Sequence, residues 1–149
     1  MGNSSSAPEI KPCLSILTRE NAMDGWKLLS NCQTQQGEKK KFCIAEVQAY
    51  GQVVQTRTGD CRASSLVIVR MTADDDTECV QGEAPIRSLG GKLRGAHPPY
   101  DDTPFIYHVD QTYKERGTDI VHIGEPCMRG LHFFREQQEV LDLRRKFKS

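Results

Sequence analysis

Cysteine and histidine are the residues of this chain that could ligate a metal ion. The 149-residue sequence contains six cysteines and four histidines. A structural zinc site needs closely spaced pairs of such ligands, but the sequence has neither a C-x-x-C pair nor an H-x-x-x-H pair. Among its nearest cysteine–histidine pairs is that of Cys127 and His132, which lie five positions apart. We therefore expect no metal and no cofactor in this protein.

A cysteine nucleophile activated by a histidine base is the second chemistry that these residue types allow. The candidates are Cys61 or Cys127 as the nucleophile and His122 or His132 as the base. No local sequence marks either thiol as activated, and a buried cysteine often acts only as a small hydrophobic residue. His132 has apolar neighbours on both sides, so in a strand its side chain points to the opposite face. We expect no catalytic residues.

The first six residues, M-G-N-S-S-S, fit the N-myristoylation pattern M-G-x-x-x-[ST]. Gly2 would accept the lipid after removal of Met1, and Ser6 supplies the hydroxyl of the pattern. The alternative is a serine-rich leader without a function. The same segment lacks the basic and apolar regions of a secretory signal. We therefore expect the chain to stay in a reducing compartment, with its cysteines as thiols.

A single myristoyl group binds membranes only weakly, so stable attachment needs a second signal. Each basic residue near an anionic leaflet contributes about 1 kcal/mol. The end of the chain offers such residues without an intervening acid, and we term them the C-terminal basic cluster: Arg144, Arg145, Lys146 and Lys148. The alternative is the solvated end of a helix. We expect an anionic membrane surface as partner, at the cytoplasmic face of membranes of an infected or host cell or in a virion, and otherwise a cytoplasmic protein.

Charge and aromatic content argue against a nucleic-acid partner. Twenty Lys and Arg balance twenty Asp and Glu, so the formal net charge is zero, whereas nucleic-acid binding needs a net or clustered positive field. Aromatic residues make up 7% of the chain and fall mostly within expected strands, where they fill a core rather than stack on bases. We expect a protein partner of unknown identity, and the oligomeric state stays open.

Length and patterning predict one α+β domain. The chain has the size of a single domain, with a flexible leader at 1–12 and the domain at 13–149. Short β-prone runs recur, and a helical period occurs only near the end. Because no helix separates the strands, we expect a mainly antiparallel β-sheet. The expected strands are 25–29, 42–49, 64–71, 105–109, 120–123 and 131–134, before a C-terminal α-helix at 135–147.

Three connecting segments complete this prediction. Residues 14–23 are either helical or extended. Residues 51–62 are polar and carry a turn signal at Gly59–Asp60. Residues 72–103 contain few aliphatic side chains and many Gly, Pro and Asp residues, so we expect a long polar loop.

Three short blocks of sequence carry a family resemblance. The first is C-R-A-S at 61–64, the second is Y-D at 100–101 followed by F-I-Y-H-V, and the third is C-M-R-G-L-H-F-F at 127–134. Together they resemble a domain of unknown function that accompanies pentapeptide-repeat proteins in large DNA viruses, phages and bacteria. The resemblance covers about residues 25–143. Asp110 stands where that family usually has Gly, and the repeats themselves are absent from this sequence.

The resemblance implies a fold and a viral or microbial context, but no mechanism, because that family has no assigned activity. It also marks a set of motif residues in this chain. They are Cys61, Arg62, Tyr100, Asp101, Cys127, Gly130, His132, Phe133 and Phe134.

The enzymatic alternative is NAD-dependent ADP-ribosyl transfer. The run G-L-H-F-F at 130–134, before a helix, is similar to the G-x-Y-F strand–helix step of ADP-ribosyltransferases. The H-G pair of such enzymes is absent, and Glu136 and Glu139 fall on the expected helix. We therefore expect a non-enzymatic interaction or scaffold domain attached to membranes through Gly2, with a degenerate ADP-ribosyltransferase-like enzyme as the alternative.

Overall fold

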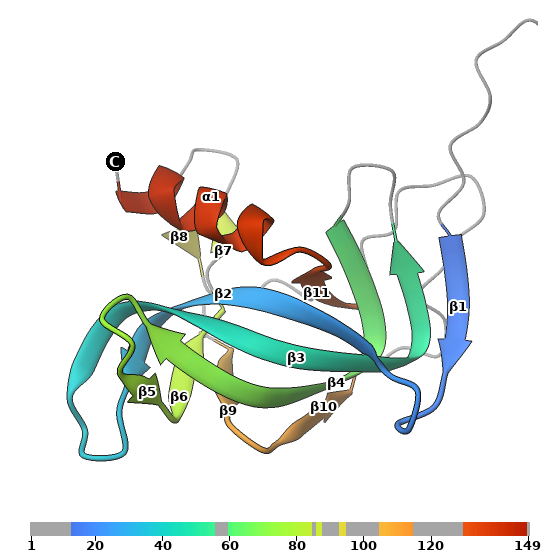
Figure 1. The fold of residues 1–149 in the computed structure, drawn as a ribbon, viewed down its shortest axis with the longest axis horizontal. Coiled ribbons are helices and arrows are strands. Elements are labelled where there is room, and N and C mark those ends of the chain that lie inside the picture. Colours follow the sequence, from blue (N-terminus) through green and yellow to red (C-terminus); the bar gives the residue numbers. More distant parts are fainter. Residues whose placement is uncertain are drawn as a thin grey trace, which may run out of the picture.

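The computed structural model of the chain describes residues 13–55, 60–84, 86–87, 93–94, 105–114 and 130–148. These residues form a large antiparallel sheet, a separate two-stranded sheet and one helix at the C-terminal end (Figure 1). The α+β class, the antiparallel sheet and the C-terminal helix expected from the sequence are thus confirmed. No helix in this part of the chain has the length and apolarity needed to cross a membrane.

Four strands carry most of the sheet: β1 (Cys13–Leu17), β2 (Met23–Gln33), β3 (Lys39–Gln55) and β4 (Asp60–Ala73). The remaining strands are short, and the helix follows the last of them. They are β5 (Glu78–Cys79), β6 (Gln81–Glu83), β7 (Ile86–Arg87), β8 (Leu93–Arg94), β9 (Ile106–His108), β10 (Thr112–Lys114), β11 (Leu131–Phe134) and α1 (Gln137–Lys148).

The large sheet closes on itself. Strands β2, β3 and β4 follow one another as an antiparallel meander, and β11 pairs with both β4 and β2, so these four strands form a ring. A second link joins β2 to β4: β6 and β9 extend from β2, while β10, which follows β9 in the chain, pairs with β4. Strand β1 pairs with β3 and lies at the edge of the sheet, on the right in Figure 1.

Side chains alternate between two hydrophobic clusters on opposite faces of the sheet, as the two-residue period of a strand requires. The inner cluster fills the closed sheet, and its largest fully buried members are Leu29, Leu66, Ile68, Met71 and Phe133. The aromatic residues of the shorter strands complete it. The rings of Phe105, Tyr107 and Tyr113 meet edge to face, with centroids 4.7–5.6 Å apart.

The outer cluster lies beneath α1. Val140 is fully buried against the sheet, and the ring of Phe147 stacks on Phe42 with centroids 6.2 Å apart. Only one stripe of the helix is apolar, so α1 is amphipathic and depends on this face for its packing. The other side chains of the outer cluster are Trp26, Leu28, Ile44, Phe134, Leu141 and Leu143.

Residues 51–62 do not form the polar connection expected from the sequence. Strand β3 continues to Gln55 and β4 begins at Asp60. The turn expected at Gly59–Asp60 is therefore wrong for Asp60, which belongs to a strand. Gly51 has a φ of +76° and lies within a register shift of the β3–β4 pairing. Because glycine tolerates this left-handed conformation, the strand passes through an irregular step here instead of ending.

Residues 72–103 contain more strand than their composition indicated. Strand β4 extends to Ala73, and β5 and β6 follow within this range. These short strands pair with β4 and β2, so long neighbours supply their hydrogen bonds and they need little apolar sequence of their own. The lead-in at 14–23 is extended as far as Leu17. The expected strand at 120–123 lies outside the described residues.

Gly25 lets β2 pass close to the ring of Phe133. A Cβ atom at position 25 would stand 2.4 Å from Phe133 Cδ2 and 2.8 Å from the carbonyl oxygen of Phe134. Phe133 is fully buried and has no room to retreat. The absence of a side chain at Gly25 therefore sets how closely β11 packs on β2.

We expect Gly25→Ala to lower the free energy of unfolding by about 1–3 kcal/mol, the usual cost of overpacking a core. Phe133→Leu should cost less in the Gly25→Ala background than in the wild type, because a smaller side chain relieves part of the clash. Urea unfolding of the four proteins in this double-mutant cycle measures both effects. Strictly additive costs would contradict the contact.

Candidate functional site

Pairing of β11 with β4 brings together two of the three sequence blocks that carry the family resemblance. Leu131 lies opposite Ala63, His132 opposite Arg62, and Phe134 opposite Asp60. The C-R-A-S and G-L-H-F-F blocks are therefore neighbours in space although they are far apart in sequence. We term this region, residues 60–63 and 130–134, the β4–β11 junction.

A glycine and an arginine of the two blocks determine where β11 begins. Gly130 has a φ of +100°, and a Cβ atom there would stand 3.0 Å from Arg62 Cβ and 3.3 Å from the carbonyl oxygen of Ala63. Arg62 Nη1 donates a hydrogen bond of 3.1 Å to the carbonyl oxygen of Gly130. The glycine permits the close approach of the two strands, and the guanidinium group holds it.

Side chains of the junction point alternately to the two faces of the sheet. Cys61 and Phe133 are buried in the inner cluster, whereas His132 and Phe134 lie on the outer face. His132 thus points away from its apolar neighbours, as expected from the sequence. Its ring meets that of Phe134 edge to face, with centroids 4.8 Å apart.

A buried lysine completes the junction on the side of β2. Backbone pairing between β11 and β2 consists of Phe134 opposite Trp26. At the next position, Lys27 Nζ donates a hydrogen bond to the carbonyl oxygen of His132 and lies 5.1 Å from the centre of the Tyr107 ring. Lys27 is only 7% exposed. Its side chain therefore links β2 to β11 across the interior where the backbone ladder is shortest.

Burial, and secondly the positive charge of Arg62, lowers the pKa of Lys27 to about 7. A neutral lysine amine can attack a carbonyl group or accept a proton. Here, however, Nζ already donates to His132 and faces the Tyr107 ring. This geometry makes Lys27 a structural link within the sheet.

The imidazole of His132 faces a carboxylate. Its Nε2 lies 3.5 Å from Asp60 Oδ2, and both side chains are 34% exposed. Burial lowers the pKa of His132, with further lowering by Lys27 and Arg62, and this outweighs the raising effect of Asp60. His132 is therefore neutral at neutral pH, and a neutral imidazole beside a carboxylate has the composition of a general base with its orienting group.

Among the cysteines whose side chains the structure describes, none lies beside this base. Cys61 points into the inner cluster and His132 into the outer face, so the nucleophile–base pair considered from the sequence is not formed between them. Burial also raises the pKa of the Cys61 thiol to about 11 and raises that of Cys79. A thiol with a raised pKa is a poor nucleophile at neutral pH.

Cys32, Cys43 and Cys79 are also buried free thiols. Hydrogen bonding to Cys32, followed by burial, raises the pKa of Cys43, and Cys79 lies beside the same pair. Among the residues that the structure describes, no group of three or more Cys, His, Asp or Glu side chains is placed to hold a metal ion. These three cysteines belong to the inner cluster.

The C-terminal basic cluster lies on α1 and is partly engaged by acidic residues. Arg144 Nη1 stands 2.6 Å from Asp74 Oδ1, and Lys148 Nζ contacts Asp74 Oδ2. Arg145 Nη1 lies 3.9 Å from Asp142 Oδ1, and its side chain is 79% exposed. Asp74 follows β4, so these contacts hold the end of the helix over the turn between β4 and β5. The cluster presents less free positive charge than its sequence indicates.

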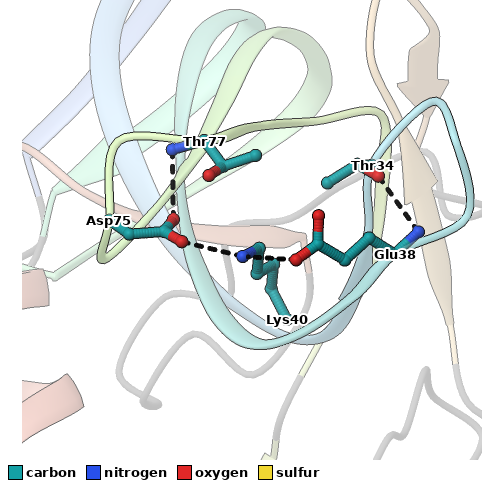
Figure 2. A network of polar contacts seen from close by, with 5 residues as sticks. All are labelled: Thr34, Glu38, Lys40, Asp75 and Thr77. Atoms are coloured by element: carbon teal, nitrogen blue, oxygen red, sulfur yellow. Dashed lines mark hydrogen bonds and ion pairs between the residues drawn. The ribbon is translucent and has the colours of Figure 1, made fainter.

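Asp75, the next acidic residue of the β4–β5 turn, contacts the β2–β3 hairpin. Figure 2 shows Lys40 Nζ between two carboxylates, 2.7 Å from Asp75 Oδ2 and 3.0 Å from Glu38 Oε1. Asp75 also accepts a hydrogen bond of 3.2 Å from the backbone N–H of Thr77. The hydrogen bonds from Lys40 and Thr77 lower the pKa of Asp75, while those to Asp75 and Glu38 raise the pKa of Lys40. This network ties the β2–β3 hairpin to the β4–β5 turn.

Several of the residues singled out in the sequence lie outside the described part of the chain. They are Gly2, the lipid acceptor, the motif residues Tyr100, Asp101 and Cys127, and His122, the other candidate base. The second block of the resemblance is therefore represented by its later part, where Phe105 and Tyr107 pack in the inner cluster.

Three polar residues that the structure brings to these sites have little signal in the sequence. Lys27 sits between apolar residues in a strand, and its burial breaks the rule that lysines stay exposed. The pair Gly59–Asp60 predicts a turn, and Asp74 belongs to a run of three aspartates that indicates only a solvated loop. The two-residue period of β2 is the one available signal, because it places Lys27 on the same face as Gly25 and Leu29.

Comparison with protein-family models, with curated proteins and with solved structures finds no match to this chain.

The lowered pKa of Lys27 predicts that stability rises with pH just above neutrality. Between about pH 7 and pH 8.5 folded Lys27 is mostly neutral, whereas the unfolded lysine, with a pKa of 10.5, is protonated. The unfolded state then binds more protons, so the free energy of unfolding should increase by up to about 1.4 kcal/mol per pH unit. Below pH 7 the lysine is protonated in both states, and this slope disappears. Urea unfolding at several pH values under reducing conditions measures it.

Lys27→Met should flatten this slope, and Lys39→Met, at an exposed lysine of β3, should retain it. Above about pH 8.5 the unfolded cysteines ionise while the buried thiols do not, which lowers stability and limits the useful range. An unchanged slope in Lys27→Met would show that another group causes the pH dependence.

Asp74→Asn should loosen the end of α1, because it removes the partner of both Arg144 and Lys148. We expect a loss of about 0.5–1.5 kcal/mol in the free energy of unfolding, the range of two partly exposed ion pairs. Asp142→Asn is the matched control, since its contact with Arg145 is long and exposed, and it should change stability by less. Equal losses in the two variants would contradict the anchoring role of Asp74.

Proposed function

We propose that this chain is a non-enzymatic interaction domain of a virus-infected or host cell, held at the cytoplasmic face of membranes by a myristoyl group on Gly2. The observation that carries the proposal is the run M-G-N-S-S-S, which satisfies every position of the acylation pattern. The viral context follows from the family resemblance of the three sequence blocks.

The arrangement of the motif residues supports an interaction domain rather than an enzyme. Phe133 and Cys61 fill the inner cluster, and Arg62 and Gly130 fix the start of β11. Lys27, whose amine has a lowered pKa, donates its hydrogen bond to the backbone of β11. These residues build the closed sheet, so their conservation in a family pattern would follow from the fold alone.

Ion pairing of the C-terminal basic cluster with Asp74 makes acylation the main contribution to the proposed membrane attachment. With Asp74 beside Arg144 and Lys148, the attraction of this cluster to an anionic leaflet is reduced. Arg145 keeps the most exposed side chain among these contacts. The electrostatic contribution is therefore secondary to acylation.

Intact-mass measurement of the protein expressed in eukaryotic cells tests this function. We expect loss of Met1 and the mass increment of one myristoyl group. Gly2→Ala should abolish the increment and move the protein from the membrane to the soluble fraction, whereas Ser4→Ala, at an unrestricted position of the pattern, should change neither. An unmodified Gly2, or membrane association that survives Gly2→Ala, would overturn the proposal.

A further inference from the structure

We propose that Leu14 and Ile16 of β1 form a second membrane contact that inserts into lipid beside the myristoyl chain. This inference rests on the proposed function and names the surface that would meet the bilayer. It also supplies the second signal that a singly acylated protein needs for stable attachment.

The first observation is the exposure of two neighbouring aliphatic side chains at the edge of the sheet. Leu14 is 47% exposed and Ile16 is 69% exposed, the two highest values among the exposed large hydrophobic residues of the described chain. They are two residues apart in a strand, so they project from the same face. Leu17 packs against the inner cluster, which places it on the other face.

The second observation is the position of β1 relative to the lipid acceptor. Strand β1 begins at Cys13, and ten residues lie between Gly2 and Cys13. Even fully extended, this segment reaches roughly 40 Å, which is comparable to the thickness of one bilayer. A myristoyl group in the membrane would therefore keep β1 close to the surface, where a weak apolar contact gains a high effective concentration.

The surroundings of β1 also suit a lipid–water interface. Leu14 lies opposite Val54 and Ile16 opposite Gln52 in the β1–β3 pairing, so no charged residue stands beside them on β3. Just beyond the strand, Arg19 lies over the ring of Tyr50, 5.9 Å from its centre. Arginine and tyrosine are side chains that favour the headgroup region.

As the second membrane signal, β1 is a better candidate than the C-terminal basic cluster. Arg144 and Lys148 of the C-terminal basic cluster are already ion-paired with Asp74. Insertion of Leu14 and Ile16 is an apolar contribution, so it should depend weakly on salt and on the charge of the lipid, unlike attraction by basic residues.

The test is vesicle binding of the myristoylated full chain, prepared by co-expression with an N-myristoyltransferase and verified by intact mass. Binding to phosphatidylcholine vesicles, with and without phosphatidylserine, is measured by co-sedimentation. We expect Leu14→Ser/Ile16→Ser to weaken binding to both vesicle types at least fivefold. The matched control is Val69→Ser/Ile106→Ser, which removes two hydrophobic residues of 40% and 41% exposure elsewhere on the sheet, and should stay within twofold of the wild type.

The outcomes separate the two proposals. If the acylated wild type binds vesicles and Leu14→Ser/Ile16→Ser binds equally well, the β1 contact is wrong and the lipid anchor stands. If eukaryotic cells leave Gly2 unmodified, the proposed function fails, and vesicle binding of the unacylated chain, compared with that of Leu14→Ser/Ile16→Ser, then tests the β1 contact alone: equal binding of the two would overturn it. Circular dichroism verifies that the double variant is folded. If the wild type dimerises in sedimentation equilibrium and the double variant does not, the surface joins two copies of the chain and the inference is overturned.

Discussion

Closure of the sheet depends on a lysine amine buried inside it. Lys27 leaves β2 toward the interior and donates to the backbone of β11, next to the one residue pair that joins these strands. Burial of an amine is unfavourable, and its lowered pKa expresses this cost. In return, the donor satisfies a carbonyl group and fixes β11 between β2 and β4. Gly25 then lets β2 approach Phe133 closely, and Arg62 holds the start of β11 through its hydrogen bond to Gly130.

The β4–β5 turn distributes its negative charge among separate elements. Asp74 holds the end of α1, and Asp75 holds Lys40 of the β2–β3 hairpin. The third aspartate, Asp76, adopts a φ of +65°, a conformation that aspartate tolerates better than most residues. A run of three acidic residues, which in sequence indicates only solvent exposure, therefore fastens both the helix and the hairpin to one turn.

Much of the architecture could be predicted because it depends on local patterning. The apolar run of β4, the alternation around His132 and the change of period after Phe134 each determine an element and its buried face. Strand ends were harder to locate, since Gly51 continues β3 through an irregular step and β5 and β6 take their hydrogen bonds from neighbours. Lys27 and Asp74 could not be assigned at all, because their roles depend on partners that are distant in sequence.

The ring also determines the order in which this chain can assemble. Strands β2, β3 and β4 are consecutive, so their pairing needs only short loops, whereas Lys27 and the carbonyl of His132 are 105 residues apart. Chain synthesis therefore delivers the meander long before the strand that closes it. Until β11 arrives, the facing edges of β2 and β4 are open to strands of other molecules at the positions that it later covers. By covering these edges, β11 protects the newly made domain from aggregation through strand pairing with other molecules.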